Sequence, residues 1–305
     1  MTAPVVGVDI GGTKTAAALV GPGGTVLDRR EVPTPARSGP DAVLDTAAGL
    51  AADLLDAGAG PVGVGTAGAV DPATGSIRYA TDSLPGWAGT PVADALSVRL
   101  GRAVRITNDV NAAALGECWA GAGRDRRHVL LVAVGTGLGG AIVRDGRVET
   151  GARGAAGEVG HLPAPDAERL RCGCGRYGHL EAIASGTGLA AAYALATGTR
   201  TTGRAVADRA AAGDEVARQI VDRAGSVLGA ALAGLVALLD PEAVLVAGGA
   251  AGALLPAASA AYSAELPAGW ADVPLLPATL GADAVVVGAA RLAMDPPDID
   301  GRTRG

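Results

Sequence analysis

Two glycine-rich segments carry the residue types that bind phosphate groups. The first runs from Asp9 to Lys14 (DIGGTK) and the second from Gly135 to Gly140 (GTGLGG). Glycine lets a backbone turn tightly and approach phosphate oxygens, while Thr13 and Lys14 add a hydroxyl and a cation. Asp9 could hold magnesium through water. The first segment alone is equally well explained as an ordinary hairpin turn, because short glycine motifs recur widely.

Both segments occupy the same place in a repeated pattern. Apolar stretches and turn residues predict strands at 5–10, 15–20 and 25–32, and again at 128–134, 141–144 and 147–150. Two turns placed in this way could face each other across a cleft and hold a triphosphate between them. The predicted phosphate-binding residues of the two turns are Asp9, Gly11, Gly12, Thr13, Lys14, Gly135, Thr136 and Gly137.

Asp109 stands where a catalytic carboxylate is expected. Residues 104–107 read as a strand, and Asn108 and Asp109 follow it directly and begin a helix. Open α/β sheets bind ligands at this carboxyl end of their strands. A carboxylate beside an attacking hydroxyl can act as a general base, which is worth about 10²–10⁴-fold in rate. Asp109 is therefore the candidate base, with capping of the helix as the alternative role.

A short region gathers the residues that could hold a metal. Its candidate ligands are His161, Cys172, Cys174 and His179. Two thiols and two imidazoles complete a tetrahedral zinc site with no position left for water, so the metal would be structural. The metal would fix the loop that carries Glu158, His161 and Glu181. The carboxylates of Glu158 and Glu181 suit sugar hydroxyls. A glycine-rich loop with incidental Cys and His is the alternative.

Length and charge limit the classes of function. A chain of 305 residues suggests two domains of the usual ~100–200 residues. The 25 basic and 31 acidic residues give a net charge of −6. No basic cluster is longer than 124–127, so nucleic acid is not an expected partner. The three cysteines, an odd number, make a poor disulfide framework and fit a reducing cytoplasm.

The hydropathy of the sequence predicts neither a membrane-spanning segment nor a signal peptide. The first residues lack a basic region, and Asp9 interrupts the apolar stretch that a signal peptide needs. The most apolar segments are 224–239, which Pro241 limits, and 243–264, which Pro256 interrupts. Neither is expected to span a membrane. A cytoplasmic location follows as a prediction.

Helices and strands that alternate along the chain predict α/β layering. Helices are expected at 41–56, 90–101, 186–196, 214–239 and 284–294, besides the one that begins near Asp109. Further strands are expected at 62–66 and 243–247. The last strand ends in Gly248 and Gly249, where a flat base or a ribose could approach the backbone. Ordinary strand-to-helix turning explains this glycine pair equally well.

These motifs, in this order, resemble the ROK family (repressors, open reading frames and kinases), which contains sugar kinases, over essentially the whole chain. The resemblance implies a two-lobed actin/hexokinase-like (ribonuclease H-like) α/β fold with a cleft between the lobes. Residues 1–115 plus 287–305 would form the smaller N-terminal lobe. Residues 116–286 would form the larger lobe, with the zinc loop and most nucleotide contacts. ATP with Mg²⁺, a structural Zn²⁺ and a homodimer are implied as well.

The family's motifs also imply roles for individual residues. The segment 9–14 is similar to the first phosphate motif and 135–140 to the second, while Gly248 and Gly249 match the adenosine motif. Asp109 matches the catalytic base, and His161 matches the metal-binding His beside Cys172 and Cys174. The positions that match the family's sugar contacts are Gly68, Asn108, Asp109, Glu158, His161 and Glu181.

Two departures from the family's pattern bear on metal and substrate. His179 occupies the position of the family's third zinc-binding cysteine, and a histidine can still ligate zinc. Ser83 replaces an Asn that often precedes Leu in the sugar loop 82–87. The shorter side chain could leave room for an acetamido group, which favours N-acetylglucosamine over glucose.

The implied reaction is ATP-dependent phosphorylation of a hexose, in which O6 attacks as Asp109 takes its proton. One alternative is a non-catalytic sugar sensor on the same scaffold. Another is an actin-fold kinase for a different acceptor, which would not need the cluster of Glu158, His161 and Glu181. Family repressors carry a DNA-binding module ahead of this region, and the position of Asp9 near the N-terminus leaves no room for one.

Overall fold

The computed structural model describes residues 3–55, 60–270 and 272–294. The chain folds into two compact units, each built from segments that are separate in sequence. The first unit comprises Met1–Asp125, Gly146–Ala156 and Ala282–Gly305. The second comprises Arg126–Asp145 and Gly157–Gly281.

A five-stranded sheet forms the centre of the first unit. Its strand order is β3-β2-β1-β4-β7, with bounds Val26–Pro33, Lys14–Val20, Val5–Ile10, Val62–Thr66 and Val104–Asn108. The strands β1, β2 and β3 form an antiparallel meander, while β1, β4 and β7 are parallel. A short hairpin of β5 (Ala69–Val70) and β6 (Ile77–Tyr79) lies apart from this sheet.

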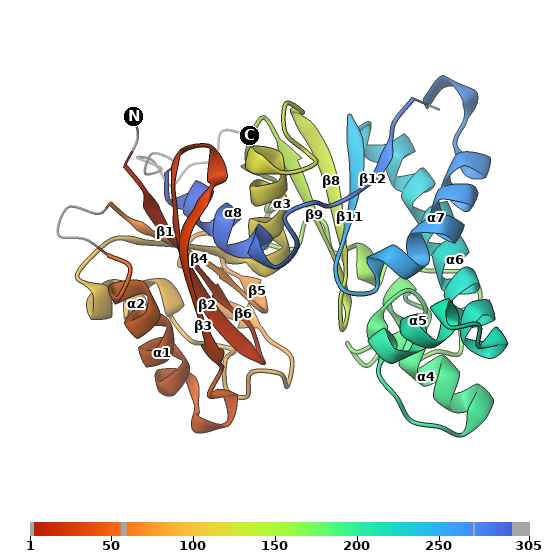
Figure 1. Cartoon of the computed structure of the whole chain (residues 1–305), viewed down its shortest axis with the longest axis horizontal. Coiled ribbons are helices and arrows are strands. Elements are labelled where there is room, and N and C mark those ends of the chain that lie inside the picture. The colour runs from red at the N-terminus through yellow and green to blue at the C-terminus, as the bar shows by residue number, and fades with distance from the viewer. Residues whose placement is uncertain (1–2, 56–59, 271, 295–305) are drawn as a thin grey trace. The chain divides into compact units, whose positions relative to one another are not determined.

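Glycines let a helix lie directly on one face of this sheet. Helix α8 (Ala284–Ala293) packs on β1 and β4 (Figure 1). A Cβ at Gly7 would lie 1.9 Å from the carbonyl oxygen of Val286, and one at Gly63 would lie 1.7 Å from that of Ala289. Because side chains alternate along a strand, Val6, Val8 and Ile10 point to the other face and are buried in the core there. The remaining helices of this unit are α1 (Pro40–Ala52), α2 (Val92–Leu100) and α3 (Asp109–Ala120).

The second unit repeats the pattern of the first. A second sheet has the order β10-β9-β8-β11-β12, with bounds Arg147–Val148, Leu138–Arg144, His128–Val134, Ala243–Ala247 and Leu275–Pro277. All of its strands belong to the second unit except β10, which falls in the segment Gly146–Ala156 of the first. Strands β8 and β9 are antiparallel and β11 runs parallel to β8, as β4 does to β1. The prediction that both halves open with a glycine-turned hairpin is therefore confirmed.

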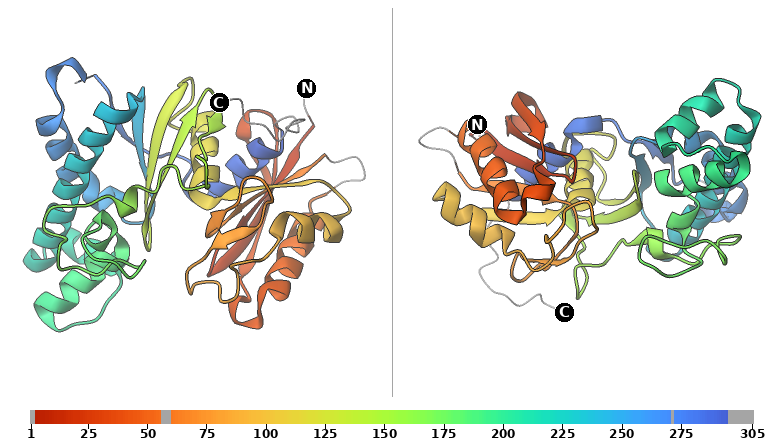
Figure 2. Two further views of the ribbon diagram at one scale, coloured as in Figure 1. Left: turned by 180° about the vertical axis from the view of Figure 1, so that it is seen from behind. Right: turned by 90° about the horizontal axis from the view of Figure 1, so that it is seen from below.

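Four helices complete the second unit: α4 (Gly186–Thr197), α5 (Gly203–Ala211), α6 (Glu215–Leu239) and α7 (Ala251–Glu265). Helices α6 and α7 run side by side (Figures 1 and 2). Their backbones come close because a Cβ at Gly225 would lie 2.6 Å from the carbonyl oxygen of Leu254, and one at Gly229 only 2.1 Å from that of Ala258. The glycines of α6 thus allow the close packing of α6 against α7.

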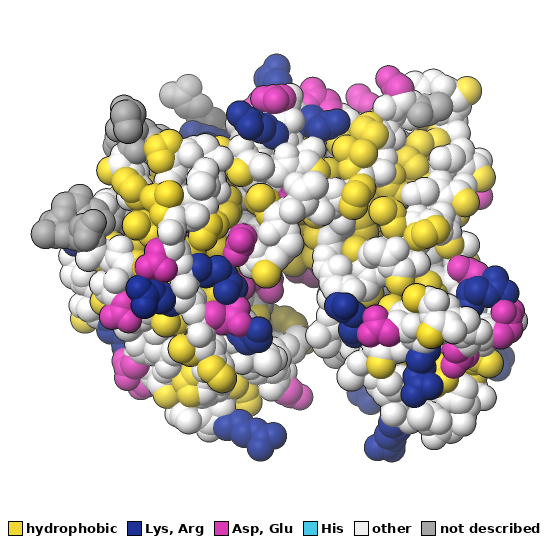
Figure 3. All heavy atoms as spheres, in the orientation of Figure 1, with side chains coloured by type: hydrophobic (Ala, Val, Ile, Leu, Met, Phe, Trp, Pro, Cys, Tyr) yellow, Lys and Arg dark blue, Asp and Glu magenta, His cyan; other side chains and the backbone are white. Residues whose placement is uncertain are grey.

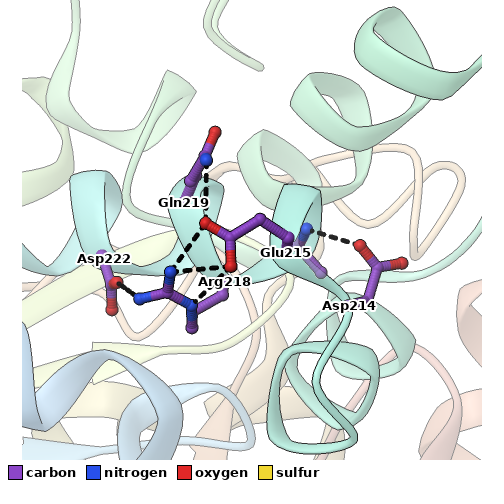
Figure 4. Close-up of polar contacts among 6 residues, drawn as sticks. Asp214, Glu215, Arg218, Gln219 and Asp222 are labelled. Carbon is purple, nitrogen blue, oxygen red and sulfur yellow. Dashed lines mark hydrogen bonds and ion pairs between the residues drawn. The ribbon is translucent and has the colours of Figure 1, made fainter.

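Helix α6 is the one described helix that is long and apolar enough to cross a membrane by length and composition. Its first turns are charged: Asp214 caps the helix through the amide of Ala217, and Glu215 pairs with Arg218 (Figure 4). Further along, Leu228, Leu232 and Val236 are fully buried in the core of the second unit. A core helix explains this pattern. On the face drawn in Figure 3, basic and acidic side chains are interspersed.

Most expected elements are present, and the differences are local. The expected turn 135–140 is wrong in its second half, because β9 already begins at Leu138. Gly140 is needed there for close packing, since a Cβ would lie 2.6 Å from the carbonyl oxygen of Gly157. Helix α1 ends at Ala52, before the expected end at Asp56, which lies outside the described residues. The sequence analysis did not predict α5, α7 or β12.

Candidate active site

The first glycine turn, Gly11–Thr13 between β1 and β2, has its carbonyl groups held from one side. Thr34 follows β3, and its hydroxyl donates to the carbonyl of Gly11 at 2.7 Å. Its amide donates to the carbonyl of Thr13 at 2.9 Å. Within the described ranges the amides of Gly12 and Thr13 donate no hydrogen bond. These two N–H groups remain available to an anion.

The predicted sugar loop lies directly against this turn. A Cβ at Gly12 would lie 2.8 Å from the Cβ of Ser83, so only glycine fits. The loop is anchored by Trp87, which is buried and donates from Nε1 to the hydroxyl of Thr66 at 3.1 Å. The hydroxyls of Ser83 and Thr81 form a hydrogen bond of 2.8 Å. The first turn and the sugar loop therefore form one packed structure.

Asp9 is the most perturbed carboxyl group near this turn. Burial, together with the negative charge of Asp109, raises its pKa to about 7, although Arg29 opposes the shift. The electrostatic effect of Asp109 means that two predicted site residues lie near each other in the first unit. Lys14 pairs with Glu31 at 2.6 Å and its side chain is 66% exposed, so its charge is already partly balanced.

Asn108, rather than Asp109, caps helix α3. The side chain of Asn108 accepts hydrogen bonds from the amides of Val110 and Asn111, and Asp109 is the first residue of the helix. The capping alternative for Asp109 is therefore wrong. Asn108 also donates from Nδ2 to the carbonyl of Gly68 at 3.0 Å. The side-chain oxygen and nitrogen of Asn108, a predicted sugar-binding residue, thus both hold the backbone around the half-buried Asp109.

The second glycine turn, Gly135–Gly137, is held in the same manner as the first. The start of α4 lies behind it: the amide of Gly186 donates to the carbonyl of Gly135 at 2.9 Å. The amide and hydroxyl of Thr187 donate to the carbonyl of Thr136 at 3.0 and 2.8 Å. In the part of the chain that is described, the amides of Thr136 and Gly137 have no acceptor.

Gly248 and Gly249 lie at the same edge of the second sheet as this turn. They follow β11, which pairs with β8 up to Ala247 and Ala133. Gly248 has a φ of +101° and a Cβ there would lie 2.3 Å from the carbonyl oxygen of Val134, so the position requires glycine. Gly249 has open space where a side chain would stand. The pair is thus adjacent to the turn that is predicted to bind phosphate.

The four predicted zinc ligands come together. One ligand atom from each of His161, Cys172, Cys174 and His179 lies within 4.8 Å of all the others. A tetrahedral zinc holds its ligand atoms roughly 3.5–4 Å apart, so a cluster of two thiols and two imidazoles whose atoms lie within 4.8 Å of one another is close to the size that the ion needs. Glu158 lies 3.4 Å from Nδ1 of His161 and can orient that ring.

Glu181 connects the metal cluster with the second glycine turn. One carboxylate oxygen accepts from the thiol of Cys172 at 3.1 Å and from the amide of Gly173 at 3.3 Å. The other accepts from the amide of Leu138, the residue after the turn, at 3.1 Å. The predicted sugar-contacting carboxylate therefore has a defined position that depends on both segments.

The predicted residues divide between the two units. Asp9, the first turn, Gly68, Asn108 and Asp109 belong to the first unit. The second turn, Gly248, Gly249 and the Glu158–Glu181 region belong to the second. The sequence analysis missed Thr34 and Thr187, which hold the turns. A threonine directly after a predicted strand or at a helix start is too common to have signalled either role.

Comparisons with known proteins identify the family and the fold of this chain. The model of the ROK family matches residues 5–296. An N-acetylmannosamine kinase of Shigella boydii serotype 18 is 39% identical over 288 residues, which cover 94% of this chain and 97% of the relative. A ROK hexokinase of Thermus thermophilus has a TM-score of 0.84 and 37% identity, covering 95% of this chain and 97% of that one.

A ROK family glucokinase of Streptomyces griseus, solved in complex with glucose and AMPPNP, has a TM-score of 0.81 and 33% identity over 95% of this chain and 98% of that one. The α/β fold with two mixed five-stranded sheets is thus the fold of these kinases, as the resemblance implied. This chain belongs to the ROK family.

Proposed function

We propose that this chain is an ATP-dependent kinase that transfers the γ-phosphoryl group to the 6-hydroxyl of a hexose. The observation that carries the proposal is the shared construction of the two glycine turns. In each turn, carbonyls are held from behind and two neighbouring amides are left without an acceptor in the described residues. Backbone amides presented in this way bind phosphate oxygens.

Asp109 is the proposed base. It begins α3 at the carboxyl end of β7, beside Asn108, which caps the helix. The proposed step forms a bond between O6 of the sugar and the γ-phosphorus and breaks the bond to the β-phosphate oxygen, which leaves with ADP. Asp109 accepts the proton of the 6-hydroxyl as this happens. Asp9 would hold Mg²⁺ through water, and this divalent cation would balance phosphate charge.

The sugar is proposed to contact Gly68, Asn108, Glu158, His161 and Glu181. The acceptors to be compared are N-acetylglucosamine and glucose, which the sequence analysis favours, and N-acetylmannosamine, the substrate named for the Shigella relative. Ser83 bears on this choice because it packs on Gly12, and a short side chain there suits a bulkier substituent on the ring.

The cluster of His161, Cys172, Cys174 and His179 is proposed to hold Zn²⁺. With four protein ligands, the ion would fix the loop that carries Glu158 and Glu181 and would activate no water. Homodimer formation and a cytoplasmic location stay predictions.

A panel of sugars tests the function. Purified protein is incubated with MgATP and with each of the three sugars or a carboxylate acceptor, and ADP release is followed by a coupled assay. We expect turnover with at least one of them and phosphate on O6 of the product. Sugar binding without ADP release would favour the sensor alternative, and turnover only with a carboxylate acceptor would favour the other kinase alternative.

A further inference from the structure

An open pocket adjoins the first glycine turn, in the first unit. Its volume is about 410 Å³. Gly12 and Thr13 line one side, and residues 34–38, which follow β3, line the other. The two unpaired amides of the turn belong to residues of this lining. None of the lining residues is acidic.

Among the described residues that line the pocket, Arg37 alone has a charged side chain. Its guanidinium is exposed and has no ion pair or hydrogen bond in the described part of the chain. Its cationic neighbours differ in this respect, since Lys14 pairs with Glu31 and Arg30 pairs with Asp28. An exposed arginine without an ion pair or hydrogen bond contributes little to the stability of the folded chain. Its position in this pocket therefore suggests a role in binding a ligand.

The backbone holds Arg37 close to the turn. Thr34 bonds to the carbonyls of Gly11 and Thr13, as described above. The amide of Ala36 donates to the carbonyl of Thr34 at 2.8 Å, and the amide of Ser38 donates to that of Pro35 at 2.9 Å. Thr34 and Ala36 therefore tie the start of the short helical turn Ala36–Ser38 to the glycine turn through hydrogen bonds.

We propose that Arg37 extends the phosphate-binding surface of the first glycine turn, so that its guanidinium and the amides of Gly12 and Thr13 hold one phosphate group in this pocket. A guanidinium and backbone N–H groups together match the oxygens of a phosphate. The inference rests on the proposed function, which offers two sources of phosphate: the phosphate chain of the donor and the 6-phosphate of the sugar product. Arg37 is thus an additional binding residue of the kinase site, beside the glycine turn.

Three variants test the pocket. Arg37→Gln removes the charge and Arg37→Lys keeps it. Arg30→Gln is the matched control, because Arg30 is also exposed and lies in the same unit but outside the pocket. For each protein we measure kcat and the KM for ATP, inhibition by the sugar 6-phosphate, and the affinity for inorganic tripolyphosphate by titration calorimetry.

In Arg37→Gln we expect the KM for ATP and the dissociation constant for tripolyphosphate to rise roughly five- to twentyfold, the loss of one charge-assisted hydrogen bond. Arg37→Lys should retain part of the affinity and Arg30→Gln all of it. An unchanged KM for ATP with weakened product inhibition would assign the pocket to the sugar phosphate.

If Arg37→Gln equals Arg30→Gln in all three measurements, the inference is overturned. If the wild-type protein phosphorylates no sugar, the proposed function fails, and the calorimetry alone then decides whether the pocket binds phosphate. Loss of tripolyphosphate binding in Arg37→Gln would support the pocket even in that case, and equal binding would refute it.

Discussion

At the scale of single residues, Asp109 is the first residue of α3 and lies next to Asn108, the residue that caps this helix. Asn108 also donates to the carbonyl of Gly68, while the carboxylate of Asp109 accepts from the amide of Val110 at 2.9 Å. We expect Asp109→Asn to lower kcat by at least about 10²-fold while the sugar dissociation constant stays near that of the wild type. Asp94→Asn, at an exposed carboxyl on α2, is the control. Near-normal turnover in Asp109→Asn would remove this residue as the base.

Asp9 gives a prediction about pH, because its pKa is raised from 3.8 to about 7 by burial and by Asp109. Well below pH 4 the carboxyl is protonated in both the folded and the unfolded chain, so burying it does not lower the free energy of unfolding. Between pH 4 and 7 the unfolded chain releases this proton first, and the folded state loses stability as the pH rises. The penalty is complete above pH 7.

Asp9→Asn should therefore be more stable than the wild type by an amount that grows from pH 4.5 to 7 and then levels off at roughly 2–4 kcal/mol. Urea unfolding at a series of pH values, without added Mg²⁺, measures the difference. Asp28→Asn should show the opposite sign, since hydrogen bonding to Arg30 lowers the pKa of Asp28. A constant difference between Asp9→Asn and wild type across this range would contradict the assignment.

At the scale of elements, each glycine turn works because another element holds its carbonyls. Thr34 after β3 does this for the first turn, and Thr187 at the start of α4 does it for the second. Thr34→Val removes the hydroxyl and keeps the shape, so the turn loses its bond from the side chain to Gly11. We expect the KM for ATP to rise several-fold, with a loss of about 1 kcal/mol in stability.

Thr46→Val is the control for Thr34→Val. Its hydroxyl also bonds to a backbone carbonyl, that of Ala42 within α1, and it lies outside the site. A stability loss in Thr34→Val equal to that of the control, with no change in the KM for ATP, would reduce Thr34 to a purely structural role.

The sequence predicted elements wherever apolar runs and turn residues agree. Strands β1, β4, β8 and β11 match the expected residues, because each is a buried run with glycine or polar residues at its ends. The glycines at 139 and 140 suggested a turn, but both lie in β9, and Gly140 serves close packing there. Helix α7 was missed because Pro256 lies inside it and ordinarily breaks a helix.

The candidate site was predictable where a residue type itself carries the chemistry. Asp109 and the four metal ligands fall in this class, because few residue types can do their work. Thr34 and Arg37 were not predictable, since their roles depend on which loop lies beside the first glycine turn. That proximity comes from the pairing of β2 with β3, and no local pattern near Thr34 reports it.

At the scale of the whole molecule, the units are assembled from segments that are separate along the chain. Length alone suggested two domains, but the segment Gly146–Ala156 belongs to the first unit although strands of the second precede it. A Cβ at Gly154 would lie 2.4 Å from the carbonyl oxygen of Val70, so this close approach demands glycine. Such long-range contacts leave no periodic signal in the sequence.

The metal cluster should affect the stability of the molecule as well as its site. The loops around His161, Cys172 and His179 have little regular structure, and a bound ion would hold them together. Burial raises the pKa of the Cys172 thiol to about 12, so metal binding has to displace its proton. Protein purified without added zinc should contain about one zinc per chain, and a chelator should lower the Tm.

Cys174→Ser should lose the metal and show the lowered Tm without a chelator, because it removes one of four ligands. Cys118→Ser is the control, since Cys118 lies on α3 outside the cluster. Mass spectrometry under native conditions measures the metal, and calorimetry measures the Tm. Zinc retained in Cys174→Ser at the wild-type level would show that these four residues are not the binding site, and an unchanged Tm after verified metal loss would separate binding from stability.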